Sequence, residues 1–229
     1  MIAPASNLPT SRNEADGKLS IKVCGMKFAE NMADVATLEP DFLGFIFVPA
    51  SARYVADKLD AGQLQALPLS IKRVGVFVNE TTDTMLRIAD QYGLNLAQLH
   101  GEETPEQCAE LQAAGLPVMK VFSVGSTFDF ATLMPYVACC TYFLFDTKGE
   151  MRGGNGTTFD WGLLKAYPLS VPYFLAGGLD LSHVETLREL QLPGLFAVDL
   201  NSRFETAPGQ KDVERLRQML DSLRDSPMN

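Results

Sequence analysis

The first apolar run with strand character reads Leu19-Ser-Ile-Lys-Val-Cys-Gly-Met26. Ile21 and Val23 lie two residues apart, so they share one face of a strand. Cys24 follows at the carboxyl end of that strand, and Gly25 permits a turn there that other residues resist. Ligands bind at this edge in α/β folds, so Cys24 is either a ligand-facing thiol or an ordinary buried cysteine.

Seven further strand-like runs follow, and helix-like segments separate them. Residues that commonly end or begin helices mark the limits of these segments: Pro40 and Pro68 follow predicted helices, and Thr104-Pro105 begins one. The predicted strands span residues 19–26, 42–48, 72–78, 94–99, 117–122, 141–146, 172–176 and 195–200. The predicted helices span residues 28–38, 56–67, 79–92, 104–115, 128–137, 159–164, 181–190 and 211–223.

Strands that alternate with helices require a parallel sheet. Eight such units predict a single α/β domain, the closed (βα)8 TIM barrel, which usually needs ~250 residues. An open six-stranded sheet is the alternative, but its dinucleotide-binding fingerprint is missing, because Cys24-Gly-Met-Lys27 contains one glycine. We assign residues 18–229 to the barrel. Residues 1–17 are predicted to be a flexible tail without the apolar periodicity needed for docking.

Composition argues against several classes of function. The formal net charge of −9 disfavours nucleic acid and anionic membranes as partners. The sequence shows no signal peptide and no apolar run of membrane length. The 4 cysteines form no C-x-x-C motif, and 2 histidines are too few for a clustered zinc site. We therefore expect a cytoplasmic protein with reduced thiols, no metal or other cofactor, and a small-molecule substrate.

Four reactive side chains lie at predicted strand ends, which in a barrel all face one mouth. Cys24 follows the first strand, Arg53 the second and Asp146 the sixth. Asp146 can act as an acid if a closed apolar site raises its pKa, and a modest electropositive field would turn Cys24 into a thiolate near neutral pH. His100 ends the fourth strand and either lines the pocket or orders loops. A metal site or a hydrolase-type thiol nucleophile lacks the further residues that it needs.

The loops after the seventh and eighth strands suggest a phosphate site. Barrel enzymes commonly hold a phosphate there through backbone N–H groups and a helix N-terminus. Gly177-Gly178 follow the seventh strand and let backbone approach an anion closely. Asn201-Ser202 follow the eighth strand and add a hydroxyl and further amides. The two loops together favour phosphate over glycines that merely end a strand.

These motifs, taken in order, resemble the phosphoribosylanthranilate isomerase family. The match runs from about Lys18 to the last predicted helix and omits only the tail. The segments that carry it are Lys22-Val-Cys-Gly25, Gly44-Phe-Ile-Phe-Val-Pro-x-Ser-x-Arg-Tyr54, Val74-Gly-Val-Phe-Val-Asn79, Gln98-Leu-His-Gly101, Phe145-Asp-Thr-Lys148, Gly153-Gly-x-Gly156, Phe159-Asp-Trp161, Ala176-Gly-Gly-Leu179, Asp199-x-Asn-Ser202 and Glu205-x-x-Pro-Gly-x-Lys-Asp212.

The resemblance implies an isomerase of tryptophan biosynthesis. Such an enzyme converts N-(5′-phosphoribosyl)anthranilate into 1-(2-carboxyphenylamino)-1-deoxyribulose 5-phosphate by an Amadori rearrangement without a cofactor. On matching positions, Cys24 would be the general base and Asp146 the general acid, and Arg53 would bind the anthranilate carboxylate. The remaining expected substrate-binding residues are His100, Gly177, Gly178, Asn201, Ser202 and Arg203.

One position departs from the family. Arg203 stands where a small residue, often glycine, is usual, which affects the details of the phosphate site. We expect no fused synthase domain. Two alternatives remain open: an isomerase of an aminoimidazole carboxamide ribotide, which is expected to use two aspartates rather than Cys24, and a catalytically inactive phosphate-binding barrel.

Overall fold

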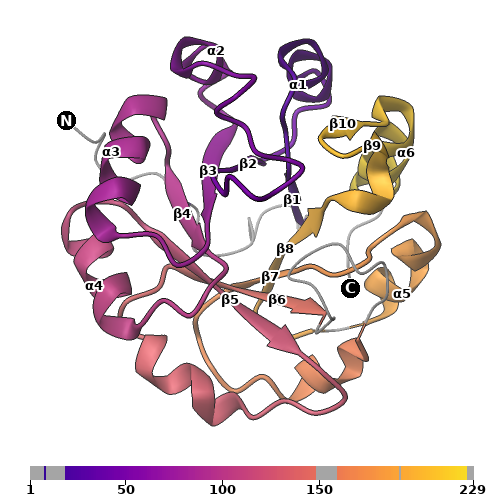
Figure 1. The fold of residues 1–229 in the computed structure, drawn as a ribbon. Helices are drawn as coiled ribbons and strands as arrows, with labels where there is room; N and C mark the ends of the chain where they lie inside the picture. Colours follow the sequence, from indigo (N-terminus) through magenta and orange to yellow (C-terminus); the bar gives the residue numbers. More distant parts are fainter. Residues whose placement is uncertain (1–7, 9–18, 148–158, 191, 226–229) are drawn as a thin grey trace.

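The structure is a computed structural model that describes residue 8 and residues 19–147, 159–190 and 192–225. Within these residues, eight parallel strands close into a barrel in chain order, and helices surround it (Figure 1). The predicted closed barrel is confirmed, and the open sheet is wrong. The strands are β1 (Ser20–Val23), β2 (Phe42–Ile46), β3 (Lys72–Phe77), β4 (Leu96–Leu99), β5 (Val118–Val124), β6 (Tyr142–Thr147), β7 (Tyr173–Leu175) and β8 (Leu195–Leu200).

Two of the predicted helices are 3₁₀ rather than α. In η1, Pro135 lies inside the segment and has no N–H to donate, which disfavours a continuous α-helix. The α-helices are α1 (Ala29–Ala36), α2 (Ala61–Gln65), α3 (Thr82–Tyr92), α4 (Pro105–Ala113), α5 (Val184–Glu189) and α6 (Val213–Arg224). The 3₁₀ helices are η1 (Phe130–Tyr136), η2 (Trp161–Ala166), η3 (Leu181–His183) and η4 (Ser202–Phe204).

A short hairpin, β9 (Glu205–Ala207) with β10 (Gln210–Lys211), precedes α6 and was not predicted. Gly209 takes a φ of 83° in its turn, a conformation that favours glycine. The hairpin is held to α1 by the Asn31 side chain, which donates to Lys211 O at 2.9 Å and accepts from Lys211 N at 2.7 Å. This contact places Glu205 and Lys211 beside the barrel mouth.

The strands separate two cores. In β6, Tyr142 and Leu144 face the barrel interior, while Phe143 and Phe145 face the surrounding helices. This alternation is the two-residue period of a strand. The interior core is filled by apolar side chains, most of them aromatic or branched: Phe42, Val74, Leu96, Met119, Val121, Phe174 and Phe196 are among them.

Leu8 is the one described residue of segment 1–17, and it is half-buried against the interior core of the barrel. The expectation that this segment has nothing with which to dock is therefore wrong at Leu8. Its other residues, and the Gly153-Gly-x-Gly156 motif, lie outside the described residues. The predicted boundary at residue 18 stays a prediction.

Replacing Leu8 by alanine is expected to lower the free energy of unfolding by about 1 kcal/mol. This is less than a Leu→Ala change usually costs at a fully buried position, because Leu8 is only half-buried. For a domain of this size, that corresponds to a fall in Tm of about 2–4 °C. Leu69→Ala is the control, because Leu69 is 84% exposed. Equal Tm values for the two variants would show that the Leu8 contact contributes nothing.

No α-helix among the described residues combines the length and apolar character needed to cross a bilayer.

Candidate active site

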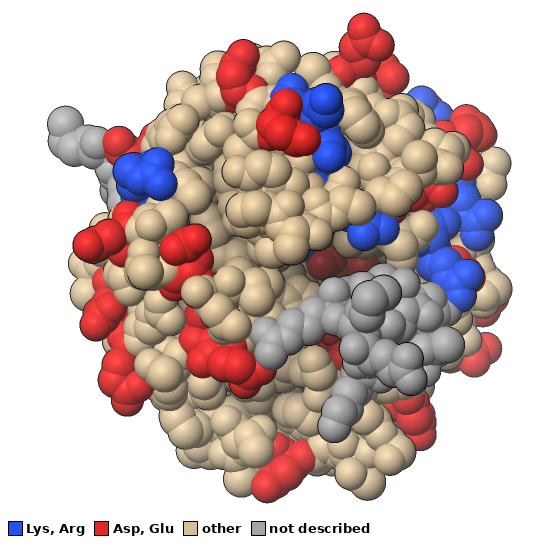
Figure 2. All heavy atoms as spheres, viewed as in Figure 1, with Lys and Arg blue, Asp and Glu red and all other residues tan. Residues whose placement is uncertain are grey.

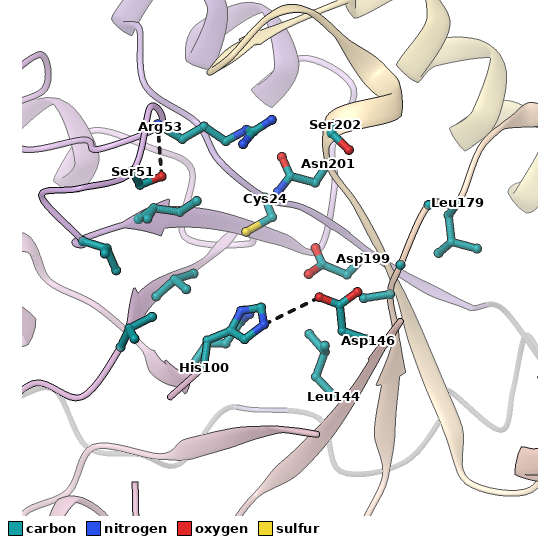
Figure 3. Close-up of a pocket in the computed structure, with 18 of the residues that line it drawn as sticks. Cys24, Ser51, Arg53, His100, Leu144, Asp146, Leu179, Asp199, Asn201 and Ser202 are labelled. Atoms are coloured by element: carbon teal, nitrogen blue, oxygen red, sulfur yellow. Dashed lines mark hydrogen bonds and ion pairs between the residues drawn. The ribbon is translucent and has the colours of Figure 1, made fainter. Parts of the chain in front are cut away.

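A pocket of about 150 Å³ opens at the carboxyl ends of the barrel strands. Figure 3 shows Cys24, His100 and Asp146 directed into it from β1, β4 and β6. His100 therefore lines the pocket, which was the first of the two positions expected for it; the other was a role in ordering loops. All the residues that the sequence placed in a site line this pocket: Cys24, Arg53, His100, Asp146, Gly177, Gly178, Asn201, Ser202 and Arg203.

The alternation of the strands explains why these side chains converge. In β6, Asp146 is the next inward position after Leu144. In β1, Ile21 and Val23 pack in the outer core, so Cys24 belongs to the inward row. The sequence predicted both positions because the apolar residues of each strand define its two faces.

Cys24 is almost fully buried and lies against β2 at Gly44. A Cβ added to Gly44 would lie 2.7 Å from Cys24 Sγ, so glycine makes room for the thiol. Burial raises the pKa of Cys24, while the ammonium groups of Lys22 and Lys211 act in the opposite direction. Burial prevails, so the pKa of the Cys24 thiol lies above its ordinary value, although the expected electropositive field of Lys22 and Lys211 is present.

Asp146 is a buried carboxyl group on the other side of the pocket. Burial raises its pKa to about 6, and the negative charge of Asp199 adds to the increase. A hydrogen bond of 2.8 Å from Thr147 N to Asp146 Oδ1 acts in the opposite direction. His100 Nε2 lies 3.6 Å from Asp146 Oδ2 (Figure 3). A carboxyl group with this pKa keeps a useful protonated fraction near neutral pH.

Lys22 and Asp199, for which no role was predicted, form a buried ion pair at the base of the pocket. They are register partners on β1 and β8, and Lys22 Nζ donates to Asp199 Oδ2 at 2.8 Å. Asp199 Oδ1 and Gln98 Oε1 have no hydrogen-bond partner among the described residues, and both residues line the pocket. Buried acceptors without partners cost free energy, so a ligand hydroxyl here would relieve that cost. The sequence did contain a signal for Lys22: it lies two residues before Cys24 on the same predicted strand, so the two side chains share the inward face.

Arg53 belongs to a charged network at the pocket rim. Its Nε lies 3.0 Å from both carboxylate oxygens of Glu205, and its Nη2 lies 2.6 Å from Oε2. Lys211 Nζ donates to Glu205 Oε1 at 2.7 Å and to Asn201 Oδ1 at 2.8 Å. The hydrogen bonds to Glu205 raise the pKa of Arg53, so the guanidinium stays charged. A Cβ added to Gly25, whose φ is 79°, would lie 2.8 Å from both Arg53 Cδ and Asn201 Oδ1.

The two predicted anion loops lie side by side on the pocket wall. Gly177 and Gly178 have φ values of 91° and 67°, and a Cβ at Gly177 would overlap Thr147. Ser202 begins η4. Arg203 is exposed at the rim, and its φ is not positive, since Glu39 and Asn79 are the described non-glycine residues with positive φ. Arg203 therefore replaces a small residue without backbone strain.

Comparison with known proteins decides the family. The model of the family described as N-(5'phosphoribosyl)anthranilate (PRA) isomerase matches residues 21–222. The chain belongs to this family. The isomerase from Phocaeicola vulgatus is 43% identical over 204 residues, which are 89% of this chain and 97% of that protein. Family membership confirms the sequence resemblance and disfavours the aminoimidazole carboxamide alternative.

Solved PRA isomerases share the fold. The crystal structure from Thermotoga maritima superposes with a TM-score of 0.80 and 33% identity, covering 91% of this chain and 100% of that one. A second structure holds reduced 1-(o-carboxyphenylamino)-1-deoxyribulose 5-phosphate. It superposes with a TM-score of 0.78 at 30% identity and covers 91% of this chain and 100% of that one.

Proposed function

We propose that this protein isomerises N-(5′-phosphoribosyl)anthranilate to 1-(2-carboxyphenylamino)-1-deoxyribulose 5-phosphate in tryptophan biosynthesis. The observation that carries the proposal is the pairing of Asp146, whose pKa is raised to about 6, with the Cys24 thiol in one pocket. An Amadori rearrangement needs one group to protonate the ring oxygen and another to remove a proton from C2′. This pocket offers both without a cofactor.

Asp146 is the acid in this proposal. It donates its proton to the furanose ring oxygen, the C1′–O bond breaks, and the nitrogen lone pair forms an iminium ion. With a pKa of about 6, roughly a tenth of Asp146 is protonated at pH 7. Bound substrate excludes water and adds negative charge, and both effects increase that fraction. The His100 imidazole beside Asp146 Oδ2 orients the carboxyl group.

Cys24 is the base in this proposal, and the reacting substrate provides the positive charge that helps the thiol to ionise. The iminium ion places a positive charge next to the buried sulfur and lowers the pKa of the thiol. Lys22 and Lys211 act in the same direction. As it ionises, the thiol releases its own proton to solvent, and the thiolate then removes the C2′ proton, which the iminium ion makes acidic. The resulting enolamine tautomerises to the ketone.

The two ends of the substrate have distinct binding partners. Arg53 uses Nε and Nη2 for Glu205, which leaves its Nη1 side to meet the anthranilate carboxylate. The phosphate is bound by backbone N–H groups of Gly177, Gly178 and Ser202. Figure 2 shows mainly acidic side chains over the α3 and α4 side of this face, and basic side chains interspersed with acidic ones near α5 and α6. An anion therefore meets less negative charge on the β7 and β8 side.

The ribose hydroxyls have matching acceptors. Asp199 Oδ1 and Gln98 Oε1 are buried and lack partners among the described residues. Hydrogen bonds from the ribose to these oxygens would fix the position of C2′ relative to Cys24. The ion pair with Lys22 holds Asp199 in place for this contact.

Turnover of the ribosylated anthranilate, followed by loss of its fluorescence, tests the proposal. We expect saturable isomerisation in the presence of a chelator. Turnover of an aminoimidazole carboxamide ribotide instead would support the alternative isomerase. Binding of the anthranilate compound without turnover would identify a catalytically inactive barrel.

Replacing Arg53 by alanine is expected to raise KM about ten- to a hundred-fold with a smaller change in kcat. A charged hydrogen bond to a carboxylate contributes about 1.5–3 kcal/mol. Arg217→Ala is the control, since that side chain is half exposed on α6. If the kcat/KM of the Arg53 variant matches that of the control, Arg53 only anchors Glu205.

We also place the enzyme in the cytoplasm. All four cysteines are free thiols in the structure, which suits a reducing compartment.

A further inference from the structure

Three of the four cysteines of the chain meet outside the barrel, away from the active site. Cys108 lies in α4, while Cys139 and Cys140 lie in the turn between η1 and β6. The Sγ atoms of all three lie within 4.8 Å of one another, and all three residues are buried. No other group of three or more metal-ligating side chains occurs at such distances among the described residues. The sequence spacing gives no hint of the cluster, because α4 and the turn are brought together only by the fold.

We propose that Cys108, Cys139 and Cys140 form a binding site for one thiophilic d¹⁰ metal ion, of the class that includes Zn²⁺, Cd²⁺ and Cu⁺. Three sulfur ligands at about 2.3 Å from a metal lie roughly 3.8 Å apart in tetrahedral geometry. The present sulfur positions need to contract by at most about 1 Å to reach that arrangement. Soft thiolate ligands select this class of ion over Mg²⁺ or Ca²⁺.

The cluster differs from a set of apolar cysteines in its polar surroundings. Hydrogen bonding from Cys140 lowers the pKa of Cys108, and the Lys120 ammonium contributes to the decrease. Lys120 itself is buried, with Nζ 3.0 Å from Glu103 Oε2. The pKa of Cys108 is thus lowered, whereas burial raises the pKa of Cys139 and the hydrogen bond with Cys108 raises that of Cys140.

Binding must release protons from the remaining thiols, because only the thiolate ligates. Affinity is therefore expected to rise with pH. The charged or titratable groups around the cluster are Lys120, Glu103, Glu106 and Tyr136. Lys120 and Glu103 form a buried ion pair, so their opposite effects on the thiols largely cancel.

Metal binding at the cluster would have a structural consequence. Cys139 and Cys140 are 5% and 6% exposed, whereas Cys108 is fully buried, so the two turn cysteines are the ligands nearer the surface. Once bound, the ion joins α4 to the turn before β6, so binding to the folded state should raise Tm.

Titration of the reduced, chelator-treated protein with Cd²⁺ under nitrogen tests the proposal. We expect one ion per chain, with the ultraviolet charge-transfer absorbance of three cadmium–thiolate bonds and a Kd below about 1 µM. Chelator competition with Zn²⁺ and with Cu⁺ then identifies the preferred ion. Each of Cys108→Ser, Cys139→Ser and Cys140→Ser should weaken binding at least ten-fold while isomerase activity is retained.

Cys24→Ser is the matched control, because it removes the one thiol outside the cluster and should leave Cd²⁺ affinity unchanged. Loss of binding in this variant, or unchanged affinity in a Cys139→Ser protein that is folded by circular dichroism, would overturn the proposal. So would a disulfide within the cluster of freshly isolated protein, which would indicate a redox pair instead.

Discussion

Asp146→Asn is expected to lower kcat by about 10²–10⁴-fold, the usual contribution of a positioned acid. Asparagine has nearly the same shape as aspartic acid but has no carboxylic proton to give to the ring oxygen. Steady-state kinetics with a circular dichroism spectrum measure the effect. Asp57→Asn is the control, because that carboxylate is exposed and pairs only loosely with Lys27, at 3.7 Å.

The pH dependence of kcat/KM provides a second test of the role of Asp146. Catalysis needs Asp146 protonated and Cys24 ionised, yet the pKa of Asp146 is about 6 and that of Cys24 lies above its ordinary value. Between these two pKa values, each rise in pH removes protonated Asp146 and adds thiolate in equal proportion. We therefore expect kcat/KM to be nearly flat between pH 6 and the pKa of Cys24 and to fall with decreasing pH below pH 6.

A near wild-type kcat for Asp146→Asn would remove Asp146 from the acid role. A profile that instead declines steadily from pH 6 upward would show that no group with a high pKa must ionise, which would contradict the role of Cys24 as well.

Much of the fold and the site was predictable because both depend on local patterns. Apolar runs of strand length marked all eight strands, and alternation within them set the inward positions of Cys24 and Asp146. Since parallel strands end at one edge of the barrel, residues at their carboxyl ends necessarily lie near one another at its mouth.

Where the prediction of helix limits failed, a local signal had been missed. The second helix begins after Asp60, whose side chain accepts from Gln63 N at 2.9 Å while Gln63 Oε1 accepts from Asp60 N at 2.9 Å. The sequence Asp60-x-x-Gln63 is typical of a capping box, and it marks the start of this helix better than the predicted start at Ala56 does. Pro208-Gly209 likewise marked the unpredicted hairpin turn.

Contacts between distant side chains could not be predicted in the same way. The pairing of Arg53 with Glu205 spans 152 residues, and the thiol cluster joins Cys108 to Cys140. No periodicity encodes which residues of two separate loops meet. The pKa of Cys24 also depends on burial, which raises it and so opposes the electropositive field of Lys22 and Lys211. The extent of that burial is not encoded in the local sequence.

Cys24→Ala is expected to lower kcat by about 10²–10⁴-fold or more, with KM changed much less. Alanine leaves the pocket walls in place but removes the group that takes the C2′ proton. Cys139→Ala is the control, because it removes another buried thiol that lies outside the pocket. Its kcat should match that of the wild type.

The residual activity of Cys24→Ala separates a base from a merely structural thiol. Without a thiolate to form, nothing offsets the loss of protonated Asp146, so residual kcat/KM should fall about ten-fold per pH unit above pH 6. Asp146 contributes its proton fully below its pKa of about 6 and loses it as pH rises, which fixes the sign of the slope. If the variant keeps the flat profile of the wild type, or keeps wild-type kcat, another group removes the proton and Cys24 only fills the space beside Gly44.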